Sequence, residues 1–216
     1  MKRVVMGVVL LAVILTSSTV FAQGRLPQTE VYFGAGIPLA PDWFKDYYQV
    51  GFSLHVQHVR FVTPNIGISI TGGYEIFTFN QDKATSDLED YGYTSVDITG
   101  NAAIAEFGLG LRPYLTPATA NAQIFLFGMA TVNIVKESLD GSYYDPYNEI
   151  TWYFEDADPE TKFGIAAGAG IEVPAGNINL IFQGVTRFIF GYGEDSDLDQ
   201  EGETISFLGV TAGIVF

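Results

Sequence analysis

The sequence predicts an all-β fold, an eight-stranded antiparallel up-and-down transmembrane β-barrel. Eight segments alternate between apolar and small or polar residues, and no apolar run after residue 22 is long enough for a spanning helix. The last segment also ends the chain on an aromatic ring, with Leu208, Val210, Ala212, Ile214 and Phe216 on one apolar face. A strand with one apolar face and one face of small or polar groups suits a closed barrel in lipid.

The N-terminal segment predicts export. A positive start, Met1-Lys2-Arg3, precedes an uncharged apolar run from Val4 to Leu15, and small residues lead to Ala22. This pattern is typical of a secretory signal peptide cleaved after Ala22. The competing interpretation is a retained membrane anchor, but the run is shorter than the roughly 18 residues that a spanning helix needs. We therefore expect a signal peptide over residues 1–22 and a barrel domain over 23–216.

The eight alternating segments are each bounded by turn-forming or charged residues. An even number of strands brings both ends of the barrel domain to the same rim. Joints at 63–65, 116–120 and 175–176 are short, whereas those at 40–47, 81–101, 137–161 and 193–202 are longer and polar. This asymmetry predicts short periplasmic turns and long extracellular loops. In chain order, the expected strands are 30–39, 48–62, 66–80, 102–114, 121–136, 162–174, 177–192 and 203–216.

Charged residues divide between the loops and one face of the strands. Of the 25 acidic residues, 21 lie in the four long loops or at their margins, and strands one, three, four and six carry one glutamate each. Phasing these strands by their apolar neighbours places all four glutamates on the face opposite the lipid. An eight-stranded barrel is only wide enough for side chains to fill it, and isolated carboxylates there would be costly. The predicted lumen charge network is Glu30, Glu75, Glu106, Arg112, Lys162, Glu172 and Arg187, with Arg60 as a further candidate cation.

The second strand does not fit simple alternation. If Phe52, Leu54 and Val56 face lipid, His58 and Arg60 should face lipid as well. A β-bulge around Gln57-His58 would turn Arg60 inward and Val59 and Phe61 outward. Alternatively, Arg60 could extend its charged end to the periplasmic rim. We expect the bulge.

Aromatic residues cluster near both predicted rims, as in the aromatic girdles of membrane barrels. We expect most of them to anchor the barrel at the two interfaces. Near the extracellular side they are Trp43, Phe44, Tyr47, Tyr48, Tyr91, Tyr93, Tyr143, Tyr144, Tyr147, Trp152, Tyr153 and Phe154, with Phe188, Phe190 and Tyr192 on the outward face of strand seven. Phe61, Tyr114 and Phe216 lie near the periplasmic edge.

These features resemble the OmpA/OmpX-type small outer-membrane barrels, part of a broad outer-membrane β-barrel superfamily. The resemblance covers residues 31–216 and rests on the strands, the Gly34-Ala-Gly36 first strand, the Thr63-Pro-Asn65 turn and terminal Phe216. In that family the barrel-assembly machinery recognises the last strand, which implies that Leu208, Val210, Ala212, Ile214 and Phe216 form the assembly signal here. The resemblance implies the architecture, but one fold serves unrelated functions.

Candidates for catalysis and metal binding are weak, and we expect neither an enzyme nor a cofactor. Ser53, His55 and an inward Glu75 or Glu30 could form a triad, although a lipid-modifying enzyme needs its groups at a rim that lipid can reach. A pair formed by His55 and His58 carries little metal specificity. The series Asp195-x-Asp197-x-Asp199 lacks the glycine and the final glutamate of a helical calcium loop.

Composition restricts the partners. Removing Lys2 and Arg3 changes the net charge from −15 to −17, so nucleic acid would be repelled. Contact with anionic lipopolysaccharide would require bridging cations, and divalent cations or basic molecules remain candidate partners at the loops, beside outer-membrane lipids. The chain has no cysteine, hence no disulfide or thiolate metal site. We expect a monomer.

Three functional classes remain open. We favour a structural or surface-interaction barrel, with a plugged lumen and acidic, aromatic-rich extracellular loops; residues 143–160 could form a contact face or a hairpin above the membrane. The second class is a narrow ion or small-solute channel. The third is a soluble barrel of the lipocalin kind, which would reverse the two faces of every strand.

Overall fold

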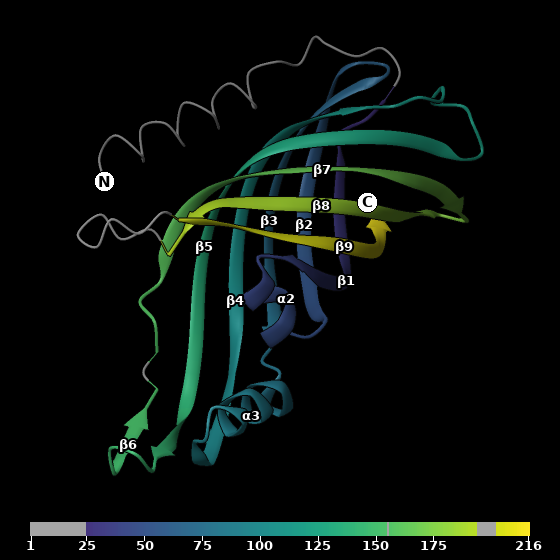
Figure 1. The fold of residues 1–216 in the computed structure, drawn as a ribbon. Coiled ribbons are helices and arrows are strands. Elements are labelled where there is room, and N and C mark those ends of the chain that lie inside the picture. Colours follow the sequence, from purple (N-terminus) through teal and green to yellow (C-terminus); the bar gives the residue numbers. More distant parts are fainter. Residues whose placement is uncertain (1–24, 155, 194–201) are drawn as a thin grey trace.

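The strands form a closed antiparallel barrel, as the alternation of apolar and polar residues predicts. The computed structural model describes residues 25–154, 156–193 and 202–216; the predicted signal peptide and the aspartate series at 195–199 lie outside them. Within this part of the chain, eight long antiparallel strands each pair with two neighbours (Figure 1). They are β1 (Gln28–Ala40), β2 (Gly51–Thr63), β3 (Ile66–Thr78), β4 (Thr94–Pro113), β5 (Gln123–Asp145), β7 (Glu160–Ala175), β8 (Ile178–Tyr192) and β9 (Glu203–Val215).

The first and last strands pair with each other to close the barrel. Tyr32 lies opposite Gly213, and β9 pairs with β8 along its other edge. At the periplasmic end, the amide N–H of Thr29 donates to the carbonyl oxygen of Phe216 at 3.1 Å, and the amide of Phe216 donates back at 2.8 Å. No edge of the eight-stranded sheet in the described chain remains open, as required where lipid offers no hydrogen-bond partners.

The outer surface of the barrel is apolar. Phe107, Leu111 and Val210 each expose more than half of their surface, whereas Glu30, Thr71 and Arg112 are buried inside. A soluble barrel of the lipocalin kind would carry the opposite arrangement. The orientation of the faces therefore favours a membrane barrel.

Two strands are longer than predicted. β4 begins at Thr94 and β5 ends at Asp145, so the two pair well beyond the predicted limits at residues 102 and 136. A short strand, β6 (Ile150–Tyr153), pairs with the end of β5 and completes a hairpin that projects from the barrel (Figure 1). The loop at 137–161 thus contains the hairpin that we considered from the sequence.

Two short helices occupy segments for which the sequence predicts loops. The first is α2 (Asp42–Tyr47), and its Phe44 side chain is buried. The second is α3 (Gln81–Asp90), whose N-cap Asn80 accepts a hydrogen bond at 3.3 Å from the backbone N–H of Lys83. An asparagine cap followed by Asp82 in the first turn favours a helix start. Neither described helix has the length and apolar character needed to cross a membrane.

The predicted bulge in strand two is wrong. Residues Gln57 and His58 pair in continuous register with both β1 and β3, and the register shifts only between Phe61 and Thr63. Strict alternation therefore continues through Val59 and Phe61, which are buried inside. Arg60 points outward instead, three residues before the Thr63 turn, which agrees with the alternative of an arginine near the periplasmic rim.

Candidate functional site: the barrel lumen and its extracellular cap

Near the periplasmic end of the lumen, neutral donors surround a buried carboxylate. The Glu172 Oε1 atom accepts from Asn179 Nδ2 at 2.7 Å and from Gln28 Nε2 at 3.2 Å. The Tyr114 hydroxyl lies 3.4 Å from the other carboxylate oxygen. Amide donors can stabilise a buried carboxylate without a bound counter-charge. The expected pairing of Glu172 with an inward cation is therefore not what the structure contains.

Arg25, which the sequence analysis did not single out, lies just below this carboxylate. Its guanidinium stacks 3.8 Å from the centre of the Tyr114 ring and 5.2 Å from that of Phe61. It also donates to the carbonyl oxygen of Thr116 at 3.3 Å. Phe61 and Tyr114, expected in the periplasmic girdle, are instead buried in the lumen. The arginine and the two rings fill the periplasmic end of the barrel.

The next layer, the Arg112 cluster, contains Arg112, Glu30, Gln57 and Tyr32. Arg112 forms a bidentate ion pair with Glu30, in which Nη1 contacts Oε1 and Nη2 lies 2.8 Å from Oε2. The Gln57 Oε1 atom accepts from Arg112 Nη2 and from the Tyr32 hydroxyl, each at 2.7 Å. Strands β4, β1 and β2 supply these side chains across the lumen. A bidentate, fully buried pair restricts both orientation and separation.

Closer to the extracellular side lies the Arg187 cluster, made of Arg187, Glu75, Glu106 and His55. Arg187 Nε donates to Glu106 Oε2 at 3.0 Å, and its Nη1 lies 3.1 Å from Glu75 Oε1. His55 Nε2 lies 3.0 Å from Glu75 Oε1 and 3.2 Å from Arg187 Nη2. When protonated, Nε2 donates to Glu75; when bare, it accepts from Arg187. One guanidinium thus joins two carboxylates and an imidazole.

A glycine on β3 makes room for the imidazole. A Cβ at Gly73 would collide with Nδ1 of His55, so only a residue without a side chain allows the ring to lie against β3. The ring also stacks on Tyr32, with centres 5.6 Å apart and planes inclined by 19°. Tyr32 therefore contacts both charged clusters.

Buried negative charge exceeds buried positive charge within the membrane-spanning part of the described chain. The buried carboxylates are those of Glu30, Glu75, Glu106 and Glu172, whereas the fully buried guanidiniums are those of Arg112 and Arg187, with Arg25 partly buried at the periplasmic end. Lys162, predicted to join them, pairs instead with Glu160 at 2.9 Å near the extracellular rim. Lys162 faces inward from β7, but it lies too close to the extracellular rim to contact the buried glutamates. Arg60 is directed outward, so it does not contribute to the lumen either.

An aromatic layer, the extracellular cap, covers the Arg187 cluster. Phe44 from α2 enters the barrel mouth and packs on Phe77, with ring centres 5.1 Å apart. Phe77 packs in turn on Phe207 at 5.2 Å, and Tyr48 lies 5.4 Å from Phe44. These four rings are almost completely buried. Phe44 and Tyr48, expected as membrane anchors, are instead buried at the barrel mouth.

The position of Tyr192 also differs from the prediction. A register shift between Ile189 and Tyr192 in the pairing of β8 with β9 departs from simple alternation. The Tyr192 ring lies 5.6 Å from that of Trp43 and packs against the extracellular cap. Phe188 and Phe190 remain on the outward face. Only part of the predicted aromatic girdle therefore faces lipid.

The candidate catalytic and metal residues do not assemble a reactive site. Ser53 is buried, and its Oγ atom has no hydrogen-bond partner among the described residues. His55 contacts Glu75 and Arg187, whereas His58 points outward and lies 3.1 Å from the Thr29 hydroxyl through Nδ1. Among the described residues, no group of three or more histidines and acidic residues is arranged to hold a metal ion.

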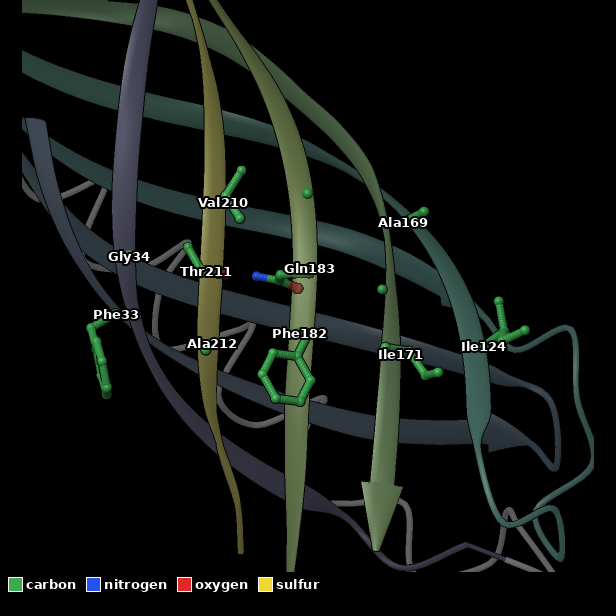
Figure 2. A pocket seen from close by; sticks show the side chains of 12 residues that line it. Phe33, Gly34, Ile124, Ala169, Ile171, Phe182, Gln183, Val210, Thr211 and Ala212 are labelled. Atoms are coloured by element: carbon green, nitrogen blue, oxygen red, sulfur yellow. The ribbon is translucent and has the colours of Figure 1, made fainter. Parts of the chain in front are cut away.

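The predicted assembly-signal residues lie on the outer face of β9. Figure 2 shows Val210 and Ala212 at an outward hollow of about 700 Å³ that spans five neighbouring strands. One cross-strand row places Ala212 between Phe33 and Phe182, and the next places Gly184 between Val210 and Ala169. The hollow follows from small side chains at Gly184, Ala169 and Ala212. Leu208 and Ile214 continue this outward face, and Phe216 is exposed just after β9.

Solved structures of known proteins resemble this chain in fold. No protein-family model and no curated protein matches the sequence. Among solved structures, neisserial surface protein A aligns with a TM-score of 0.54 at 10% identity, over 88% of this chain and 95% of that one. A major outer membrane protein of Thermus thermophilus aligns with a TM-score of 0.48 at 14% identity, over 89% and 100%. Ail of Yersinia pestis aligns with a TM-score of 0.45 at 12% identity, over 89% of this chain and 100% of that one.

The fold therefore defines a small outer-membrane-type β-barrel. Eight antiparallel strands, an apolar exterior and a filled lumen are the architecture of OmpA/OmpX-type barrels, and the predicted resemblance is confirmed at the level of fold. At 10–14% identity, the solved structures show similarity of fold alone.

Proposed function

We propose that this chain is an integral outer-membrane protein that does not conduct, and that its extracellular side makes structural or surface contacts. The observation that carries this proposal is the series of buried side chains along the inside of the barrel. The Glu172 site, the Arg112 cluster, the Arg187 cluster and the extracellular cap follow one another from the periplasmic to the extracellular rim. Buried side chains at all four levels support a lumen without a continuous water-filled path.

The extracellular side supplies a contact surface. Tyr91, Tyr147 and Tyr153 expose between 75% and 81% of their surface in the described loops. Acidic residues are dense in the same loops, and the whole chain carries 25 acids against 10 basic residues. Exposed tyrosines offer apolar area with a polar end, and the negative field favours divalent cations or basic partners. No catalytic step enters this function.

The proposal also covers export and assembly of the barrel. The proposal includes export by the signal peptide at 1–22 and folding as a monomer. Recognition of Leu208, Val210, Ala212, Ile214 and Phe216 by the barrel-assembly machinery is supported by their outward positions. Changing Phe216 to alanine should lower the amount of heat-modifiable barrel in outer-membrane fractions, whereas an Ile150→Ala control on β6 should not.

Planar-bilayer recording tests the proposal against the narrow-channel alternative. The refolded mature barrel in symmetric potassium chloride should give no steady single-channel steps. Steady steps that disappear when Glu106 is changed to glutamine or Arg112 to methionine would establish the channel instead. Heat-modifiable migration of the same preparation shows that the barrel in the recording is folded.

A further inference from the structure

A pocket lies outside the barrel on its extracellular side, between the two helices and the projecting hairpin. Its volume is about 290 Å³, near the lower end for small-molecule sites. Residues of α2, α3, β4 and β5 line it, together with Tyr48, Phe79, Tyr91 and Phe154. The helices and the longer β4–β5 hairpin, which the sequence did not predict in full, create this pocket.

The walls are aromatic or aliphatic, and the charges that line them have one sign. Of the twelve lining residues, ten are apolar or aromatic, and the two charged ones are Asp87 and Glu137. Rings of Trp43, Tyr47 and Tyr91 contribute to the wall. An aromatic ring presents a negative face that attracts cations, and the attraction strengthens where water is excluded.

The two carboxylates differ in how far their charge is balanced. Asp87 forms an ion pair with Lys83 on α3 and accepts a hydrogen bond from the Tyr47 hydroxyl at 2.9 Å. Glu137 forms no salt bridge with a lysine or arginine in the described part of the chain; the hydroxyls of Tyr192 and Tyr48 hydrogen-bond to its carboxylate, and its Oε1 atom is buried without a hydrogen-bond partner. Burial raises the pKa of this carboxyl above its usual value. Asp87 thus has a cationic partner, whereas Glu137 has only neutral ones among the described residues, so a cation bound in the pocket would find its unpaired carboxylate at Glu137.

We propose that this pocket binds a small organic ammonium compound whose apolar part is about the size of one aromatic ring. The ammonium group lies toward Glu137 and the aromatic faces, and the apolar body packs against Leu88, Ile98 and Leu139. An anionic ligand would be repelled by Glu137 and Asp87. A neutral apolar ligand would leave the Glu137 charge unbalanced. The proposal goes beyond the proposed function and does not depend on whether the lumen conducts.

Trp43 provides a direct probe. The mature chain has two tryptophans, Trp43 and Trp152, so a Trp152→Phe protein reports Trp43 alone. This protein is placed in nanodiscs of zwitterionic lipid, since detergent would compete for an apolar pocket. It is titrated with phenethylamine, 2-phenylethanol and 3-phenylpropionate, which carry a positive, no and a negative charge on similar bodies. Empty nanodiscs correct for partition into lipid.

Phenethylamine should change Trp43 emission saturably, with affinity about tenfold above that of 2-phenylethanol, and phenylpropionate should be weakest. A Glu137→Gln change should lower the phenethylamine affinity by about tenfold and leave 2-phenylethanol unchanged. Asp90→Asn is the matched control, because Asp90 is an exposed carboxylate of α3 outside the pocket lining. No saturable response to phenethylamine, equal affinity for the three compounds, or equal effects of Glu137→Gln and Asp90→Asn would overturn the proposal.

Discussion

Arg112 and Glu30 meet across the lumen although their strands, β4 and β1, are not neighbours in the sheet. Both carboxylate oxygens contact the guanidinium, and neither side chain is exposed to solvent. The Arg112 guanidinium also lies 4.3 Å from the centre of the Phe125 ring on β5. This one pair therefore connects opposite walls of the barrel.

Removing either partner of this pair should destabilise the barrel strongly, because the other charge stays buried. We expect Arg112→Met or Glu30→Gln to lower the free energy of unfolding by about 3–5 kcal/mol. The double change should cost less than the sum, since it leaves no unpaired charge. Urea titration of barrels in lipid vesicles, followed by tryptophan fluorescence, measures the three values. Glu89→Gln on the exposed face of α3 is the control, and a single-variant cost below about 1 kcal/mol would contradict this role.

The Arg187 cluster predicts a different pattern of coupling. Arg187→Gln leaves Glu75 and Glu106 without a cation, so two buried carboxylates should repel each other. Adding Glu106→Gln to that variant should restore part of the lost stability. The same urea titrations give the coupling free energy. Additive effects of the two changes would show that Arg187 does not act through Glu106.

Phe44 should hold the extracellular cap in place. Replacing it with alanine removes a ring packed on Phe77 and Tyr48, at a cost of about 3–5 kcal/mol if the barrel mouth does not collapse. Tyr91→Ala, which removes a ring that is 78% exposed, should cost much less. Thermal unfolding followed by circular dichroism compares the two variants. Equal stability of the two would mean that the cap is not a packed layer.

Contact between the two helices should depend on pH through Asp87. Hydrogen bonds from Lys83 and Tyr47 lower the pKa of this carboxyl below its usual value. A depressed folded-state pKa adds stability above the ordinary pKa of aspartate, and this stability is lost as the pH falls through the lowered value. The protection of the α3 amides, which is the intrinsic exchange rate at each pH divided by the measured rate, should therefore fall at acidic pH. An Asp87→Asn variant should lose that dependence, and retention of it would assign the effect to another group.

The sequence predicts the barrel well because a period of two is a local property of each strand. The inward positions of Glu75, Glu106 and Arg187 follow from their neighbours, and the structure places them together. The sequence does not predict as well which side chains these buried charges pair with. The Glu172 carboxylate accepts hydrogen bonds from Gln28 and Asn179. Neutral amide donors can take the place of a cationic partner where their geometry is suitable.

The bulge predicted in strand two is wrong because that prediction depended on one charged residue. Avoiding lipid contact for Arg60 led to a bulge, whereas a long side chain near a rim allows regular alternation to continue. Regular alternation would have placed Gln57 inside, beside Arg112. The sequence does not predict the helices because both are short and depend on tertiary contacts. Phe44 of α2 packs at the barrel mouth, and α3 lies against β4 and α2; the one local signal is the Asn80 cap.

Access of water to the lumen tests the closed barrel most directly. Ser53 is 1% exposed, lies in the lumen beside Glu75 in register, and can be replaced by cysteine with little change in shape in a chain that has no cysteine. The measurement is the rate at which a charged methanethiosulfonate modifies Ser53→Cys in the folded barrel, with Tyr147→Cys at the exposed hairpin as the reference. A closed lumen predicts fast modification at position 147 and modification at position 53 only after unfolding in urea. Similar rates at the two positions in the folded barrel would contradict it.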